Sequence, residues 1–263
     1  MVINPADGER NAIRGFVPQY RISASLILRH LHEKNLKWIK IADPAAGLVD
    51  DFQICRHSQV DAYQVKWSTY PNNFTLNDLI KKSKKAPSLI SQLAEGWLNL
   101  REKYPDFRIV VHLVTNKTAS SSGGIPKGEI ALPNRHFAGF IEQCWKPLQD
   151  KTLGFEWKVP QEWRKTWEII RVASGLSEEQ FKTFVCSCRL EFRYSLPIDK
   201  PTTLEQQIVE KDVDHVTTTL FNVVIDPQHI VKLDSEELLI KLGWKDRFEY
   251  RSLHEFPVNE EYY

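Results

Sequence analysis

Two short strand-like stretches joined by four polar residues most constrain how this chain can fold. Residues 48–55 and 60–67 are rich in apolar and β-branched side chains, and the sequence RHSQ at 56–59 joins them. A connection this short brings neighbouring strands together as an antiparallel hairpin. Side chains alternate between the two faces of a strand, so Gln64 and Lys66 are expected to point the same way.

The same hairpin carries residues that suit phosphodiester cleavage. An acidic pair, Asp50 and Asp51, lies at the start of its first strand, and Gln64 and Lys66 lie at the end of the second. If the register brings Asp51 beside Gln64, a carboxylate and an amide oxygen converge, and such hard oxygen ligands suit Mg²⁺. The metal would polarise a phosphoryl oxygen and lower the pKa of a bound water. Lys66 would position that water or neutralise charge on the phosphate.

A glutamine at the second ligand position has a specific consequence. Gln64 in place of a glutamate removes one negative charge from the metal site. We therefore expect weak metal binding until a substrate phosphate supplies the missing anion. An aspartate followed by Gln-x-Lys also occurs by chance in many hairpins, so the elements around the motif have to support the interpretation.

Hydrophobic periodicity predicts those surrounding elements. In chain order they are a helix at 19–34, a strand at 36–42, the hairpin, a helix capped by Thr75 or Asn77, a second helix at 88–103 after Pro87, and a buried strand at 108–115. This order resembles the αβββαβ core of the PD-(D/E)XK nucleases. The expected fold class is therefore α/β, a restriction-endonuclease-like core with a mixed sheet.

The C-terminal half is expected to be rich in helices. Its predicted elements are a loop at 116–128, helices at 134–148, 161–173, 177–186, 203–211, 213–221 and 234–242, and a strand at 188–195. The predicted organisation is an N-terminal arm at 1–15 and a nuclease domain at 16–245, with its core at 16–116 and a helical elaboration at 130–245. Residues 246–263 are interpreted as a connector.

Charge and cysteine usage exclude several classes of protein. The 35 basic and 34 acidic residues give a net charge of +1, so any site for a polyanion must be a local patch rather than a uniformly basic surface. Four cysteines without a zinc-binding spacing fit a reducing cytoplasm. The chain shows no signal peptide and no apolar run of membrane-spanning length, which predicts a cytoplasmic protein without a membrane partner.

One local basic patch follows the hairpin. It consists of four lysines around a serine, Lys81, Lys82, Lys84 and Lys85. Contacts to the phosphate backbone of DNA are one interpretation, and they would be independent of sequence and sensitive to salt. A solvated helix face is the other. Glu33, at the end of the first predicted helix, is a further candidate for the metal site, although a surface glutamate is the simpler interpretation.

A family resemblance supports the nuclease interpretation. Three segments together resemble the N-terminal double-stranded DNA endonuclease domain of bacterial antiphage systems, namely Gly15-Phe16 with Gln19 and a leucine-rich helix, Asp50-Asp51-Phe52, and Tyr63-Gln64-Val65-Lys66. That family includes nuclease effectors of cyclic-oligonucleotide (CBASS) defence and nuclease modules fused to antiviral STAND NTPases (Avs). The resemblance covers roughly residues 10–115, and Pro18 departs from it where the family usually has an aromatic residue.

The resemblance assigns roles to the hairpin residues. It implies that Asp51 and Gln64 are metal ligands for Mg²⁺, with Mn²⁺ as a substitute, that Lys66 is the catalytic lysine, and that Asp50 is an acidic neighbour. The implied substrate is duplex DNA, cut with little sequence specificity after nuclease domains self-associate.

The C-terminal tail adds a second resemblance. Residues 243–263 are similar to the segment that leads into the NTPase of the STAND fusions, which implies C-terminal NTPase and sensor domains and a viral trigger protein as partners. No G-x-x-x-x-G-K-[ST] motif occurs in the chain itself. Two alternatives stay open: a catalytically inactive nuclease fold that binds DNA or scaffolds an assembly, and an RNA-directed nuclease.

Overall fold

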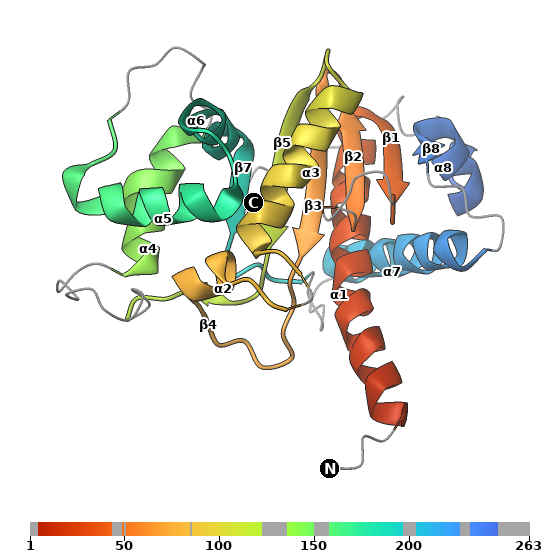
Figure 1. Cartoon of the computed structure of the whole chain (residues 1–263). Helices are drawn as coiled ribbons and strands as arrows, with labels where there is room; N and C mark the ends of the chain where they lie inside the picture. Colours follow the sequence, from red (N-terminus) through yellow and green to blue (C-terminus); the bar gives the residue numbers. More distant parts are fainter. Residues whose placement is uncertain are drawn as a thin grey trace.

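A six-stranded mixed sheet forms the centre of the protein (Figure 1). The computed structural model describes residues 5–43, 49, 51–84, 86–122, 136–149, 158–196, 204–226 and 232–246. In spatial order the strands are β7 (Cys188–Glu191), β5 (Arg108–Val114), β3 (Gln59–Val65), β2 (Phe52–Arg56), β1 (Leu36–Ile41) and β8 (Lys232–Asp234). The α/β fold class and the mixed sheet are confirmed.

The predicted hairpin is present as β2 and β3. The two strands pair antiparallel with Phe52 opposite Tyr63, and His57 takes a positive φ of 43° in the turn between them. Positive φ at such a turn matches the twist of paired strands. On its other side β3 pairs parallel with β5, and β5 pairs parallel with β7. The central strand β3 is thus held on both edges.

Helices cover the two faces of the sheet (Figure 1). Helix α3 (Leu89–Lys103) lies on one face, where its apolar side joins Val60 and Ala62 of β3 in one buried cluster. Helices α1 (Pro5–His32) and α7 (Leu204–Ile225) cover the other face, where Phe52 and Tyr63 belong to a second cluster. The alternation of β3 therefore sends Gln64 toward the α3 side, together with Val60 and Ala62.

Most of the predicted helices form, with capping residues that explain where they begin. The capping box of Thr75 starts α2 (Leu76–Ile80), and Ser88 caps α3 directly after Pro87. Residues 137–148 form one continuous helical stretch that changes type along its length, in place of the α-helix expected at 134–148. The remaining elements are α4 (Phe137–Phe140), a π-helix (Ile141–Trp145), 3-10 helices (Lys146–Leu148 and Gln161–Trp163), α5 (Arg164–Ser174), α6 (Glu178–Ser187) and α8 (Ser235–Leu242).

Three expectations about the chain ends and connections need correction. Helix α1 begins at Pro5, so residues 5–15 of the predicted arm are helical and continuous with the helix expected at 19–34. The two helices expected at 203–211 and 213–221 form the single helix α7, because no glycine or proline separates them. The loop expected at 116–128 contains the short strand β6 (Thr118–Ala119), which pairs with β4 (Asn73–Phe74).

The C-terminal half also completes the sheet. The strand expected at 188–195 is present as β7, which has four residues and forms one edge. Strand β8 has only three residues, too short for a periodic signal, and forms the other edge. The connector at 246–263 lies outside the described residues beyond position 246. Among the helices that are described, none is both long and apolar enough to cross a membrane.

A charged cluster ties the three parallel strands together on the α1 side of the sheet. His112 of β5 lies between two carboxylates, with Nε2 3.0 Å from Oδ1 of Asp61 and Nδ1 2.6 Å from Oε1 of Glu191. Arg56 donates from Nε to the other oxygen of Asp61 at 2.9 Å. Ionised carboxylates only accept hydrogen bonds, so both ring nitrogens of His112 have to donate and the imidazole is cationic.

The pKa values of the cluster agree with this charge state. Burial opposes the charged form of His112, but hydrogen bonds and charges from Asp61 and Glu191 outweigh it and raise the His112 pKa. Burial likewise opposes the charged form of Asp61, yet His112 and Arg56 lower the Asp61 pKa. When folding raises the pKa of a histidine, its protonated form stabilises the folded state. This stabilisation is fully present below the unfolded pKa of about 6.5 and is lost as the pH rises through the folded pKa.

This cluster predicts a pH-dependent stability. The free energy of unfolding of the wild type should fall as the pH rises from 6 to 9, with a slope of up to about 1.4 kcal/mol per pH unit from His112. His112→Gln removes the titrating group, so it should cost about 1–3 kcal/mol at pH 6 and lose that slope. Urea unfolding followed by tryptophan fluorescence measures both quantities. His57→Gln in the exposed turn is the control, and an equal slope in wild type and His112→Gln would contradict the assignment.

Candidate active site

Asp51 and Gln64 meet where the hairpin strands reach the end of the sheet. Gln64 lies in β3 and Asp51 directly precedes β2, so the register of Phe52 with Tyr63 places them opposite one another. Nε2 of Gln64 donates to Oδ2 of Asp51 at 2.8 Å. The backbone N–H of Val65 donates to the same oxygen at 2.5 Å. The structure therefore brings together the two side chains that the sequence identified as a ligand pair.

The backbone of Asp51 is fixed from two further directions. Its carbonyl oxygen accepts from the N–H of Ala42 at 3.2 Å and from Nε2 of Gln19 at 3.3 Å. Burial, and then the charge of Asp51, raise the pKa of the neighbouring Tyr20. Gln19 was recognised in the sequence as part of the family pattern, without a role. Its contact with Asp51 crosses 32 positions of the chain and had no local signal.

Lys66 is the first residue beyond β3 and is exposed. Its backbone N–H donates to the carbonyl of Val114 at 2.8 Å, which continues the parallel pairing with β5. Gln64, in contrast, is only 4% exposed. The three residues differ in exposure: the amide of Gln64 is buried, the carboxylate of Asp51 is partly buried, and Lys66 is exposed to solvent. A polyanionic substrate can reach such a lysine without any opening of the core.

A second acid on the α3 side is neutralised by lysines. Oδ2 of Asp43 lies 3.2 Å from Nζ of Lys40 and 3.3 Å from Nζ of Lys103, and Gln53 donates to it at 3.4 Å. Burial opposes the charge of Lys40, but Tyr104 and Asp43 raise the Lys40 pKa overall. With two ammonium groups on one carboxylate oxygen, Asp43 fixes the end of β1 against α3.

The structure does not bring every candidate to this site. Glu33 accepts hydrogen bonds from Asn35 at 2.7 Å and from His30 at 3.2 Å, and its charge acts on Arg56 at the far end of β2 from Asp51. Glu33 therefore does not join Asp51 and Gln64, which corrects its candidacy as an additional ligand. Asp50 lies outside the described residues. Within them, no group of three or more His, Cys, Asp or Glu side chains is arranged to hold a metal.

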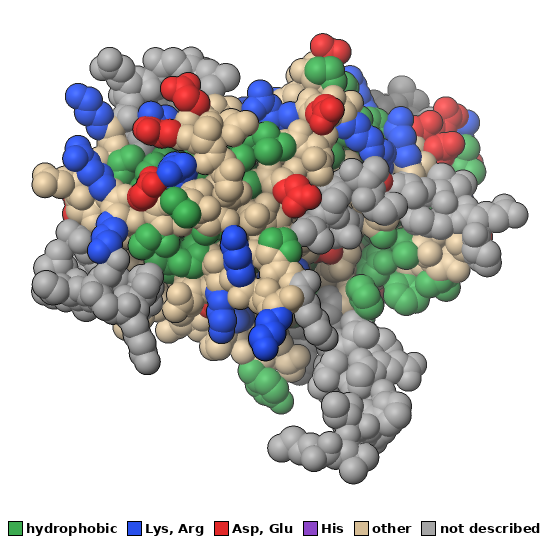
Figure 2. All heavy atoms as spheres, in the orientation of Figure 1, with side chains coloured by type: hydrophobic (Ala, Val, Ile, Leu, Met, Phe, Trp, Pro, Cys, Tyr) green, Lys and Arg blue, Asp and Glu red, His purple; other side chains and the backbone are tan. Residues whose placement is uncertain are grey.

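The lysine patch is placed at the end of α2. Lys81 caps the helix, and Lys81, Lys82 and Lys84 are all exposed, whereas Lys85 lies outside the described residues. Figure 2 shows Lys and Arg side chains gathered over the position of α2. The structure is thus compatible with both interpretations of this patch, a phosphate contact and a solvated helix end.

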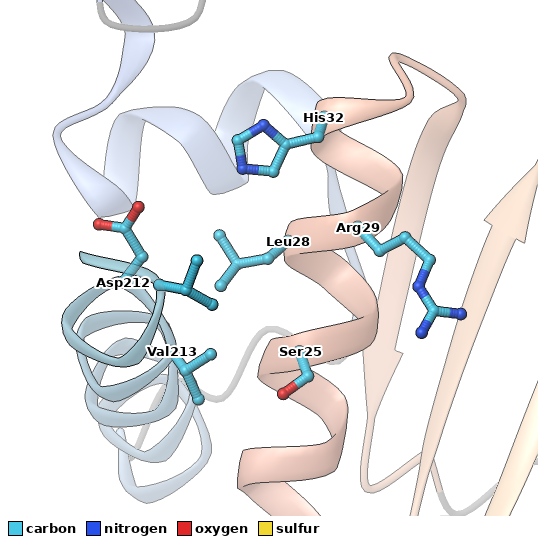
Figure 3. Close-up of a pocket in the computed structure, with 7 residues that line it drawn as sticks. Ser25, Leu28, Arg29, His32, Asp212 and Val213 are labelled. Atoms are coloured by element: carbon cyan, nitrogen blue, oxygen red, sulfur yellow. The ribbon is translucent and has the colours of Figure 1, made fainter. Parts of the chain in front are cut away.

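A pocket of about 240 Å³ lies between α1 and α7 (Figure 3). Leu28 and Val213 lie between the two helices, with His32 on α1 and Asp212 on α7 among the other lining residues. Figure 3 also shows Arg29 pointing away from the pocket, toward the strands. None of the candidate catalytic residues lines this pocket, so the pocket is separate from the hairpin site.

Comparison with known families agrees with the hairpin motif. The family model described as "Cap4, dsDNA endonuclease domain" matches residues 10–187, which is more than half of the chain. The match extends the region of resemblance from the core through the helices α4 to α6. No curated protein matches the sequence.

Proposed function

This chain belongs to the Cap4 double-stranded DNA endonuclease family, and we propose that Asp51, Gln64 and Lys66 form its catalytic centre. The observation that carries the proposal is the direct contact between Asp51 and Gln64 at 2.8 Å, next to the exposed Lys66. The proposed reaction is metal-dependent hydrolysis of the phosphodiester backbone of duplex DNA with little sequence specificity.

The donor set fits a divalent metal ion. Asp51 offers carboxylate oxygens and Gln64 an amide oxygen. In the structure Nε2 of Gln64 donates to Asp51, and rotation of the amide would present its oxygen at the same place. Mg²⁺ takes oxygen ligands and keeps several waters, so two protein ligands leave room for substrate phosphate. When bound, the ion would supply an activated water and polarise the phosphoryl oxygen. Mn²⁺ is expected to substitute.

The protein residues have separate tasks in this proposal. The N–H of Val65 and the amide of Gln64 orient the carboxylate of Asp51, and Gln19 holds the backbone of Asp51. Lys66 places a positive charge where negative charge develops on the phosphate in the transition state. The hydrogen bonds from Val65 and Gln19 exist before substrate binds, so the carboxylate and backbone of Asp51 need little reorganisation during the reaction.

Substitution of the catalytic residues tests the proposed site. Lys66→Ala and Asp51→Asn should each slow cleavage of plasmid DNA in Mg²⁺ by about 100-fold or more. Lys66→Ala removes the positive charge beside the reacting phosphate, and Asp51→Asn removes the carboxylate proposed to bind the metal. The measurement is the rate of plasmid conversion on agarose gels, with the full-length protein. Lys241→Ala on the exposed face of α8 is the control. Undiminished cleavage by Lys66→Ala or Asp51→Asn would reject the site.

Substitution of Gln64 tests the proposed metal site. Gln64→Glu adds the carboxylate that the site lacks, so it should bind Mn²⁺ in the absence of DNA at least about tenfold more tightly than the wild type. Isothermal titration calorimetry measures this affinity, and chelation of the metal should abolish cleavage. Gln59→Glu is a matched control, because Gln59 also donates to a buried aspartate, Asp61, at 2.7 Å. Equal Mn²⁺ affinity in wild type and Gln64→Glu would argue against metal binding by Gln64.

Substitution of the lysine patch tests its proposed contact with DNA. We propose that Lys81, Lys82 and Lys84 contact the phosphate backbone from the end of α2. Their joint replacement by alanine should weaken binding to all DNA sequences alike and reduce the slope of log Kd against log salt by up to about one per lysine. Fluorescence anisotropy with two unrelated duplexes measures both effects. An unchanged salt slope would leave the lysines as a solvated helix end.

Regulation and context complete the proposal. A nuclease without sequence preference would damage host DNA, so we propose that self-association of nuclease domains activates it as an effector of antiphage defence. A C-terminal NTPase, a sensor domain and a viral trigger protein are the proposed partners. Cleavage that increases with protein concentration more steeply than in direct proportion supports activation by assembly.

The same assays separate the two alternatives. DNA binding that is independent of metal and unaffected by Asp51→Asn, without cleavage, supports an inactive scaffold. Preferential degradation of RNA over duplex DNA supports an RNA nuclease.

A further inference from the structure

A side chain just beyond the neighbouring strand β5 holds the segment that carries Lys66. Asn116 lies two residues beyond β5, and Ser68 lies two residues beyond Lys66. The N–H of Ser68 donates to Oδ1 of Asn116 at 3.1 Å, and Nδ2 of Asn116 donates to the carbonyl of Ser68 at 2.7 Å. One amide side chain thus satisfies both backbone groups of a single residue, 48 positions away in the chain.

This clamp extends the sheet past the catalytic lysine. Regular pairing of β3 with β5 ends at Val65, and the N–H of Lys66 still reaches the carbonyl of Val114. The side chain of Asn116 then supplies the next donor and acceptor, as a strand partner would. The backbone of Lys66 is consequently fixed on both sides, by the Val65 N–H bonded to Asp51 before it and by Ser68 after it.

Asn116 is itself held by a frame of backbone hydrogen bonds. The N–H of Thr115 donates to the carbonyl of Glu191 at 3.0 Å, and the N–H of Tyr194 donates to the carbonyl of Thr115 at 3.0 Å. Beyond Asn116, the N–H of Arg193 donates to the carbonyl of Lys117 at 2.9 Å. Arg193 adopts a φ of 59°, a left-handed conformation that non-glycine residues take at some cost.

The left-handed conformation of Arg193 makes these backbone hydrogen bonds around Asn116 possible. It lets the chain after β7 return to residues 115–117, so that this segment is anchored on both sides of Asn116. An anchored backbone leaves the side chain of Asn116 few alternative orientations. The clamp is therefore a rigid element rather than a chance surface contact.

We propose that Asn116 is a positioning residue for Lys66, which it serves by fixing the backbone that directs the lysine toward the substrate phosphate. This inference rests on the proposed function of Lys66. The side chain of an exposed lysine is long and flexible, and only its backbone end is fixed. The position and direction of that backbone therefore set the region that the ammonium group can reach. Asparagine suits the task because its side chain offers one donor and one acceptor to Ser68, whereas aspartate offers acceptors only and alanine offers neither.

The first experiment measures the clamp itself. Hydrogen–deuterium exchange of the full-length protein, followed by mass spectrometry of peptides covering residues 65–70, reports the amide of Ser68. Asn116→Ala should accelerate exchange there roughly fivefold or more, the equivalent of about one net hydrogen bond. Asn116→Asp keeps an acceptor for this amide and should retain most of the protection. Unchanged exchange in Asn116→Ala overturns the proposal whatever the cleavage rate.

The second experiment measures the consequence for catalysis. Single-turnover cleavage of a duplex at saturating protein and Mg²⁺ should be slower by roughly 10–100-fold in Asn116→Ala, because small misplacements of a catalytic group cost that much, with an intermediate rate for Asn116→Asp. DNA affinity should stay within twofold of the wild type, since both polar groups of Asn116 are used by Ser68. Asn99→Ala on the exposed side of α3 is the matched control.

A double variant separates positioning from general destabilisation. If Asn116 acts through Lys66, then adding Asn116→Ala to Lys66→Ala should not reduce the residual rate further. An additional loss of tenfold or more in the double variant overturns the proposal, as does a wild-type rate in Asn116→Ala when Lys66→Ala is inactive. A full rate in Lys66→Ala is a different result, because it overturns the proposed function and the role of Asn116 with it.

Discussion

The hydrogen bonds on one carboxylate oxygen organise this site. Oδ2 of Asp51 accepts from the backbone of Val65 and from the side chain of Gln64, which joins the start of β2 to the end of β3. Charged acceptors form strong hydrogen bonds with backbone N–H groups, so this contact fixes register as well as orientation. The position of Lys66 follows directly, because only one peptide unit separates it from the bonded N–H of Val65.

The two faces of β3 have different tasks. On the α3 side, Gln64 approaches Asp51 at the edge of a large apolar cluster. On the α1 side, Asp61 joins His112 and Glu191 across the three parallel strands. The alternation of side chains along a strand allows this division. The charged cluster keeps the parallel strands in register while the opposite face presents the residues proposed for chemistry.

The sequence predicted the parts of this structure that depend on local patterns. The hairpin, the caps at Thr75 and Ser88 and the buried strand β5 follow from turns, capping residues and hydrophobic runs, and the pairing of Asp51 with Gln64 follows from hairpin register. The sequence could not indicate contacts between distant segments. Gln19 reaches Asp51 across 32 positions and Asn116 reaches Ser68 across 48, and neither contact leaves a periodic signal. Strand β8 is too short to have one, and Glu33 was misplaced because a helix end alone does not show which end of the sheet it meets.

The parallel pairing of β3, β5 and β7 has a consequence for synthesis of the protein. The frame around Asn116 requires the carbonyl of Glu191 and the N–H groups of Arg193 and Tyr194, which are made long after the hairpin. A nascent chain that has only reached α3 contains Asp51, Gln64 and Lys66, but lacks β5 and Asn116, which bond to the backbone of Lys66 and Ser68. Since parallel strands pair only after the intervening chain is complete, the backbone contacts that position Lys66 cannot be assembled early in translation. The topology therefore delays the formation of a DNA-cutting site until most of the polypeptide exists.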